Sequence, residues 1–216
     1  MASQVTILNT EKSVLNQILY ELRDREIQTD RMRFRKNLQR TGCLMAYEIS
    51  KQLDYEEKEV TTPLGQLQMQ LPVQSPVLVS ILRAGLPLHE GFLDIFDKAD
   101  NGFISAFRQH TAGNDFIVKV EYQAVPPLHS RDLILIDPMI ATGQSIVLSY
   151  KSLMEAGTPG RIFIAGLVAS DEGLAYVQRH IPKARIFVAA VDKELTAKAY
   201  IVPGLGDAGD LAFGEK

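Results

Sequence analysis

The stretch LILIDPMIATGQS, residues 133–145, joins a short apolar run to an aspartate and then to a loop of small and hydroxyl-bearing residues. A continuous apolar run of this length is typical of a strand that is buried on both faces, as in parallel sheets. In open parallel sheets, ligands bind beyond the carboxyl ends of the strands. The stretch therefore predicts a parallel sheet and a ligand site at one of its edges.

Other apolar runs repeat this pattern along the chain. They are VLVSIL (77–82), FISAF (103–107), IFIAGLVA (162–169) and IFVAAV (186–191). Segments with helical spacing separate most of them, at 86–97, 143–156 and 171–180. This alternation predicts an α/β fold, with an open, mainly parallel, twisted sheet flanked by helices. The segment FIVKVEY (116–122) leaves two alternatives, a flexible arm or a hairpin.

The N-terminal part of the chain has a different pattern. Residues 11–25 and 30–53 place apolar side chains three and four positions apart, which predicts two amphipathic helices. The stretch EVTTPLGQLQMQL (59–71) has a turn at Pro63–Gly65 between alternating segments, and this predicts a small projecting β-hairpin. With 216 residues, 46% of them hydrophobic, we expect a single domain spanning 1–216.

Charge and cysteine content narrow the classes of function. The formal net charge is -3, so no overall field attracts nucleic acid or an anionic membrane. Cys43 is the only cysteine, which excludes an internal disulfide and fits a reducing compartment. The first residues lack a secretory pattern, and the longest apolar runs are shorter than the roughly 20 residues that span a bilayer. We expect a soluble cytoplasmic protein, in which any anion binding is local.

The first candidate site residues follow the apolar run 133–136. Asp137 lies at the predicted sheet edge, and the residues after it lead into a helix that begins near Gln144. Unpaired N–H groups at a helix start bind phosphate, and the hydroxyl groups of Thr142 and Ser145 add donors. Asp137 can accept hydrogen bonds from sugar hydroxyls. The alternative is that Asp137 and Thr142 only cap the helix.

A second junction, SILRAGL, places Arg83 and Gly85 after the strand 77–82. An arginine at a sheet edge suits bidentate contact with phosphate oxygens, and a glycine permits close backbone approach. The alternative is that Arg83 is a solvated surface charge.

The four histidines do not predict a metal site. His89, His110, His129 and His180 are too scattered in the sequence to have the spacing of metal ligands.

The third junction is the glycine-rich stretch YIVPGLGDAGDLAFG, residues 200–214. Its glycines match a dinucleotide-binding pattern, but the chain ends before the required acidic residue about 20 positions on, which argues against a nicotinamide-dependent oxidoreductase. A frayed tail is one alternative. The apolar residues Tyr200, Ile201, Val202, Leu205 and Phe213 favour a packed loop instead. The backbone of such a loop can recognise a small planar heterocycle by hydrogen bonds.

In order and spacing, DPMIATGQS, SILRAGL and YIVPGLGDAGD resemble the uracil phosphoribosyltransferases, as do DRMRFRKNLQRTGCLMAYE (30–48) and FISAFRQ (103–109). The resemblance implies a type I phosphoribosyltransferase fold. It also implies transfer of phosphoribosyl from phosphoribosyl pyrophosphate (PRPP) to uracil, giving UMP and pyrophosphate in pyrimidine salvage. Mg²⁺ would be bound through PRPP. A homodimer or higher homo-oligomer and a GTP effector are further expectations from the resemblance.

The resemblance also implies roles for particular residues. Catalytic roles fall to Asp137, Asp207 and Arg83. Ile201, Gly206, Asp207 and Ala208 would contact uracil. PRPP would be bound by the loop residues Asp137, Pro138, Met139, Ile140, Ala141, Thr142, Gly143, Gln144 and Ser145, together with Arg83, Arg108 and Asp207.

Several positions depart from the family pattern: Gln144, Thr196, Ala199, Leu211 and the arm 109–127. At these positions the turnover rate, the contacts of the arm and any regulation by a nucleotide do not follow from the resemblance. One alternative function is a non-catalytic protein that senses uracil, UMP or PRPP in the same pocket. Another is a related transferase for a different base, which the C-terminal stretch disfavours.

Overall fold

The main sheet of the computed structural model contains eight strands. The structure describes residues 4–110 and 116–215, with the side chains of 106–119 outside the described part. The strands are β1 (Gln4–Ile7), β4 (Val77–Leu82), β5 (Asp100–His110), β6 (Phe116–Ala124), β7 (Asp132–Ile136), β8 (Met139–Ile140), β9 (Arg161–Ser170) and β10 (Arg185–Asp192).

The strand order is β1-β10-β9-β7-β4-β5-β6, and β8 pairs with β9. All pairs are parallel except β5 with β6, which run antiparallel. The expectation of an open, mainly parallel sheet is therefore confirmed. The pairing also settles the alternatives for 116–122, because this segment lies in β6 and forms a hairpin with β5.

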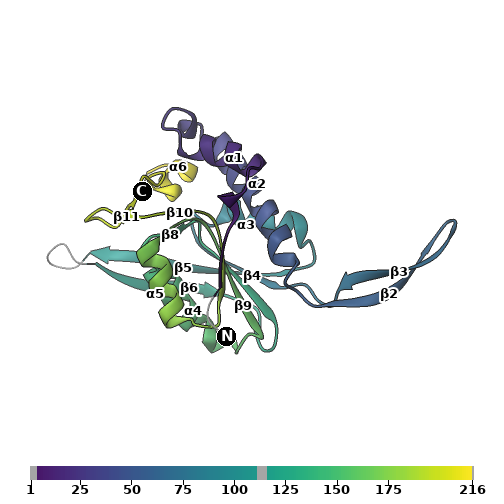
Figure 1. The fold of residues 1–216 in the computed structure, drawn as a ribbon. Coiled ribbons are helices and arrows are strands. Elements are labelled where there is room, and N and C mark those ends of the chain that lie inside the picture. Colours follow the sequence, from purple (N-terminus) through teal and green to yellow (C-terminus); the bar gives the residue numbers. More distant parts are fainter. Residues whose placement is uncertain (1–3, 111–115, 216) are drawn as a thin grey trace.

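Helices cover both faces of this sheet (Figure 1). Leu78 and Ile134 join a core cluster with α1, α2 and α3, whereas Val77 and Leu133 join a second cluster with α4 and α5. Alternate residues of each strand thus enter opposite cores, which explains why the runs are continuously apolar. The helices are α1 (Val14–Arg23), α2 (Arg31–Ser50), α3 (Leu86–Ile95), α4 (Gln144–Leu153), α5 (Asp171–His180) and α6 (Ala208–Phe213).

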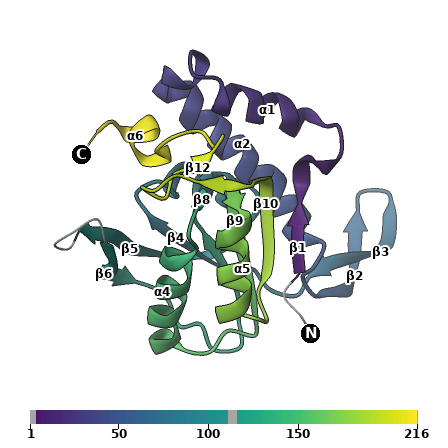
Figure 2. The same ribbon diagram turned by 60° about the vertical axis from the view of Figure 1, so that its left-hand side comes forward.

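Two small sheets lie outside the main one. The strands β2 (Tyr55–Thr62) and β3 (Gly65–Pro72) form the predicted hairpin, which projects from the body of the molecule (Figures 1 and 2). Near the C-terminus, β11 (Glu194–Leu195) pairs with β12 (Ile201–Val202). In the described part of the chain, no helix has the length and apolar character needed to cross a membrane.

The bounds of the elements differ in part from the expectations. The helix expected at 171–180 coincides with α5, whereas those expected at 11–25 and 30–53 are shorter at both ends. Strand β1 was not predicted, because its four residues are only partly buried and carry little pattern. Helix α6 was not predicted either, since the glycine-rich sequence before it resembles a loop.

Candidate functional site

β4, β7 and β9 are neighbouring parallel strands, so their carboxyl ends point to the same edge of the sheet. Ser80 is in register with Ile136 and Ile136 with Ala165, so β4 and β7 end at nearly the same level, whereas β9 continues to Ser170 beside β8. Gly85 shows how tightly this edge is packed, because a Cβ atom there would lie 2.3 Å from Oγ of Ser80. The junctions after β4 and β7 are therefore neighbours.

The loop after β7 is anchored to β9 by its backbone. The N–H of Asp137 donates to the carbonyl oxygen of Ala165 at 3.1 Å, and the carbonyl of Pro138 accepts from Leu167 and Val168 at 2.9 and 3.0 Å. Asp137 is 9% exposed, and its Oδ1 lies 3.4 Å from the N–H of Met139. The loop thus has a fixed position relative to the sheet.

The second half of the loop packs against the start of α5. Gly143 has a φ of +73°, and a Cβ atom there would lie 2.7 Å from the carbonyl oxygen of Gly173. Ser170 donates to the carbonyl of Ala141 at 2.5 Å and accepts from the N–H of Gly173 at 2.8 Å. Sequence reasoning missed Ser170 and Gly173, although a serine that ends an apolar run before a helix is a capping signal.

Helix α4 begins at Gln144 without a side-chain cap. Oγ1 of Thr142 lies 3.5 Å from the N–H of Gln144, which is too long to satisfy that group. Thr142 thus makes one long contact with the start of α4, whereas Oδ1 of Asp137 faces the N–H of Met139. Thr142, Gln144 and Ser145 are partly exposed, whereas the side chains of Ile140 and Ala141 are buried. The loop presents hydroxyl and N–H groups and keeps its apolar side chains in the core.

Arg83 joins the junction after β4 to the C-terminal segment. Its Nη2 donates to Oδ1 of Asp210 at 2.8 Å and to the carbonyl of Gly214 at 2.6 Å. Its Nε is buried and has no hydrogen-bond partner among the described residues. Arg83 is therefore not a solvated surface charge, and the structure brings together two segments that are far apart in the sequence. The side chain of Arg108, on β5, is outside the described part.

The C-terminal segment is packed and not frayed. Ile201, Leu205 and Ala208 are 5%, 4% and 2% exposed and belong to the core cluster under α1 and α2. Gly206 and Asp207, by contrast, are exposed. Oδ1 of Asp207 caps α6 by accepting from Gly209 and Asp210 at 2.8 and 3.0 Å. The proposed base-contacting residues thus lie where a buried loop turns outward, and α6 lies beside α2 (Figure 2).

The departures from the family pattern have structural counterparts. Ala199 has a φ of +58°, in the region that favours glycine. Oγ1 of Thr196 accepts from the N–H of Tyr200 at 3.1 Å, as an asparagine side chain would in such a turn. Leu211 packs against the core, and Gln144 is the first residue of α4. The arm 109–127 contains the end of β5, β6 and residues outside the described part.

Titratable side chains give no metal site in the part of the chain whose side chains the structure describes, residues 4–105 and 120–215. No group of three or more histidine, cysteine, aspartate or glutamate side chains is close enough to hold an ion. Asp137 and Asp207 are the carboxylates of the predicted site. A divalent ion at this edge would depend on oxygen atoms that a ligand supplies.

The chain is similar to proteins of one family along almost its whole length. Residues 9–215 match the family model for uracil phosphoribosyltransferase. A uracil phosphoribosyltransferase of Porphyromonas gingivalis is 47% identical over 214 residues and is covered to 99%, as is this chain. One from Thermococcus gammatolerans is 42% identical over 201 residues, which cover 92% of this chain and 88% of the relative.

A solved structure is similar to this one in fold. The AQ2163 protein from Aquifex aeolicus matches this structure with a TM-score of 0.87 and 29% sequence identity. The match covers 98% of each chain. The arrangement of helices and strands is therefore shared over nearly the whole chain.

Replacing Gly143 with alanine is expected to disturb the loop before α4. A non-glycine residue in the left-handed region costs about 1–2 kcal/mol, and the added Cβ would also press on Gly173. We expect a loss of about 2 kcal/mol in unfolding free energy and roughly tenfold weaker binding of ribose 5-phosphate. Denaturant unfolding and calorimetric titration measure the two effects. Gly65→Ala is the control, because no atom lies within 4 Å of its Cβ position.

Replacing Ala199 with glycine is expected to stabilise the protein. Relief of the left-handed strain at Ala199 outweighs the extra chain entropy of glycine, leaving a net gain of about 0.5–1 kcal/mol. The thermal midpoint should rise for Ala199→Gly and fall slightly for the control Ala197→Gly in the same turn. A fall for both variants would contradict the strain at Ala199.

Proposed function

The chain belongs to the uracil phosphoribosyltransferase family, and we propose that it transfers phosphoribosyl to uracil at the edge formed by β4, β7 and the C-terminal segment. The activity is that of its relatives in pyrimidine salvage, so the chain is an enzyme, a uracil phosphoribosyltransferase. The alternatives of a non-catalytic sensor and of a transferase for another base gain no support from these relatives. The roles of individual residues, given below, are proposals.

The 5′-phosphate of PRPP would bind at the start of α4. The start of α4 offers backbone N–H groups, with the hydroxyl group of Thr142 in the loop before it and that of Ser145 in its first turn. Asp137, at the head of the loop, would accept hydrogen bonds from the ribose hydroxyls. In the transition state the reacting sugar carbon becomes cation-like, and a carboxylate beside the ribose stabilises that charge.

The diphosphate of PRPP would bind at Arg83, with Arg108 as a second cation. The unpartnered Nε of Arg83 supports this role, because a buried donor without an acceptor is satisfied when a phosphate oxygen binds. Negative charge grows on the leaving pyrophosphate, so a fixed guanidinium stabilises the transition state more than the ground state. PRPP would enter as its Mg²⁺ complex, which makes the ion part of the substrate.

Uracil would be recognised by the backbone of Ile201, Gly206, Asp207 and Ala208. Asp207 caps the N–H groups of Gly209 and Asp210, so the cap leaves the N–H of Ala208 to other acceptors. Uracil presents an acceptor, a donor and an acceptor along one edge, whereas cytosine reverses part of this pattern. Unpaired polar groups in a closed site can give about 10⁴-fold discrimination. Asp207 would also approach PRPP.

One observation carries this assignment of roles: Arg83 contacts the C-terminal segment, while β4, the strand directly before it, pairs with β7, the strand that leads to Asp137. The proposed sites for phosphate, diphosphate and base are thereby adjacent. Asp210 forms an ion pair with Arg83, so the diphosphate would compete with Asp210 for the guanidinium. A GTP effector and a cytoplasmic location stay predictions.

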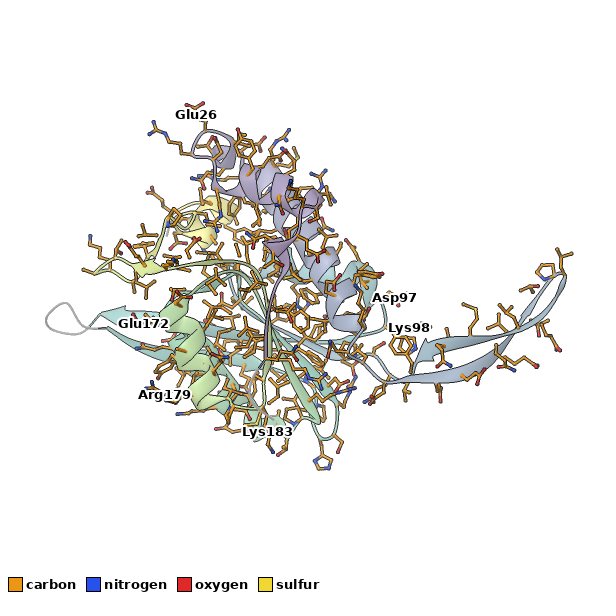
Figure 3. All side chains as sticks on the ribbon, viewed as in Figure 1. Glu26, Asp97, Lys98, Glu172, Arg179 and Lys183 are labelled. Carbon is orange, nitrogen blue, oxygen red and sulfur yellow. The ribbon has the colours of Figure 1, made fainter. Side chains whose placement is uncertain are left out.

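The projecting hairpin supports a homodimer. From the register of β2 and β3, Val60, Leu67, Met69 and Leu71 share one face with the ion pair of Glu56 and Lys58, so the apolar side chains of this face come mainly from β3. Glutamate and glutamine residues dominate the other face. Leu67 and Met69 are 45% and 43% exposed. A two-stranded hairpin is marginally stable in water unless its apolar face is covered, and Figures 1 and 3 show no element beside it. A second copy of the chain would cover this face.

Arg83→Ala is expected to slow UMP formation. It removes a charge-assisted contact of about 1.5–3 kcal/mol to the leaving group, so kcat/KM for PRPP should fall roughly ten- to a hundredfold. The measurement is a steady-state assay with uracil, PRPP and Mg²⁺, with cytosine as the control base. The wild-type protein should form a nucleotide from uracil and not from cytosine.

Asp210→Asn distinguishes the proposed contact of Arg83 with the diphosphate from its contact with the C-terminal segment. It weakens the Arg83–Asp210 ion pair while keeping the cation, so kcat/KM for PRPP should stay the same or rise. Equal losses in Arg83→Ala and Asp210→Asn would show that Arg83 acts by holding the C-terminal segment. The direct diphosphate role would then be refuted.

The double variant Leu67→Glu/Met69→Glu is expected to be a monomer. It places two charges on the apolar face of the hairpin, where burial against a partner would be unfavourable. Gln68→Glu/Gln70→Glu adds the same charge on the other face and should leave the oligomer intact. Light scattering after size exclusion measures the mass, against 24.0 kDa for one chain. A dimer that survives the first double variant would contradict the proposal.

A further inference from the structure

Asp192, the last residue of β10, binds an arginine and the C-terminal segment at the same time. Its carboxylate accepts hydrogen bonds from Nη1 and Nη2 of Arg23 at 2.7 and 3.1 Å, and from the N–H of Gly204 at 2.9 Å. Nη1 of Arg23 also donates to the carbonyl oxygen of Gly204 at 3.1 Å. Both backbone polar groups of Gly204 are therefore bonded to one ion pair, which we call the Gly204 clamp.

The clamp is largely shielded from solvent. The side chain of Asp192 is 9% exposed and that of Arg23 is 24% exposed. Bidentate contact between a guanidinium and a carboxylate fixes both distance and orientation, and water weakens such a pair less when it is buried. Arg23 is also the last residue of α1, where a cation interacts favourably with the helix dipole. The clamp thus joins α1, β10 and the C-terminal segment rigidly.

A second side chain, that of Gln28, holds Leu205, the residue after Gly204. With its amide nitrogen facing the two carbonyl groups, Gln28 donates to Leu205 at 2.9 Å and to Leu22 at 3.1 Å. Backbone groups of the consecutive residues Gly204 and Leu205 are therefore held from the N-terminal helices. The exposed residues Gly206 and Asp207 follow directly.

We infer that Arg23 and Asp192 are positioning residues for base recognition: the Gly204 clamp holds the backbone of Gly206–Ala208 in the orientation that forms hydrogen bonds with uracil. The inference rests on the proposed uracil contacts of that backbone. A glycine-rich segment has little conformational restriction of its own. Recognition by main-chain groups, however, requires that they be held within about 0.5 Å of the productive geometry. The clamp supplies this restriction from residues that do not touch the base.

Asp192→Asn tests the inference with little change in side-chain size. An amide can accept from Gly204 or from Arg23, but it cannot keep the bidentate ion pair, so the loop gains freedom. We expect KM for uracil to rise roughly tenfold, KM for PRPP to change less than twofold, and the ratio of kcat/KM for uracil over cytosine to fall at least tenfold. The ratio is independent of the fraction of folded enzyme. Arg23→Lys, which keeps the charge, should show the same pattern more weakly.

The control is Arg35→Gln. Arg35 also ties an N-terminal helix to the C-terminal segment, through Nη1 and the carbonyl of Ala212 at 2.7 Å, but it does so beyond the proposed base-contacting residues. This variant should lower the thermal midpoint without changing the base ratio. An unchanged ratio in Asp192→Asn and Arg23→Lys, or equal falls in these variants and in Arg35→Gln, would overturn the role of the clamp.

Gly206→Ala separates failure of the clamp from failure of the proposed uracil site. Gly206 has a φ of +95°, so alanine there disturbs the base-reading backbone itself. If this variant leaves KM for uracil unchanged, the base binds elsewhere, and both proposals are wrong. If it raises KM for uracil while Asp192→Asn does not, the uracil site stands and the clamp inference alone is refuted.

Discussion

The parallel hydrogen bonding of β4, β7 and β9 is the constraint on which the site depends. Parallel strands require long crossovers on the faces of the sheet, so each strand ends at the same edge and leads into a helix or loop there. At this edge α3 and α4 begin without side-chain caps, whereas α1, α2, α5 and α6 each begin with one. In α3 the N–H of Leu86 donates to Arg83 and Pro87 has no N–H, so the open backbone donors of this edge lie at the start of α4, where the 5′-phosphate is proposed to bind.

Arginine side chains hold the glycine-rich C-terminal segment in place. Arg23, Arg35 and Arg83 each donate to one of its carbonyl groups, on Gly204, Ala212 and Gly214. Glycine supplies no side chain to pack, so side chains of α1, α2 and the junction after β4 add to the order that the buried Ile201, Leu205 and Ala208 give this segment. A net charge of -3 conceals this local concentration of cations. The N-terminal helices are therefore part of the site's framework, although none of their residues is proposed to touch substrate.

Much of the fold could be predicted because apolar periodicity depends on local sequence. The runs 77–82, 133–136 and 186–191 are all in strands, since residues buried on both faces leave a continuous signal. Strand β1 and helix α6 are short and only partly buried, so they carry little signal of this kind. Figure 3 shows both ends of α5, with Glu172 nearer the site edge than Arg179, as expected for a helix that follows a strand ending there.

The sequence by itself determined the fold class and the family, and it identified the three segments proposed to bind substrate, because apolar runs and loop motifs are contiguous. Only the tertiary structure decided how these segments meet and what holds them. Arg23 and Asp192 are 169 positions apart, and Arg83 and Asp210 are 127 positions apart. No local pattern links such residues, since their pairing follows from the sheet order and from the packing of α1 and α2 over its edge.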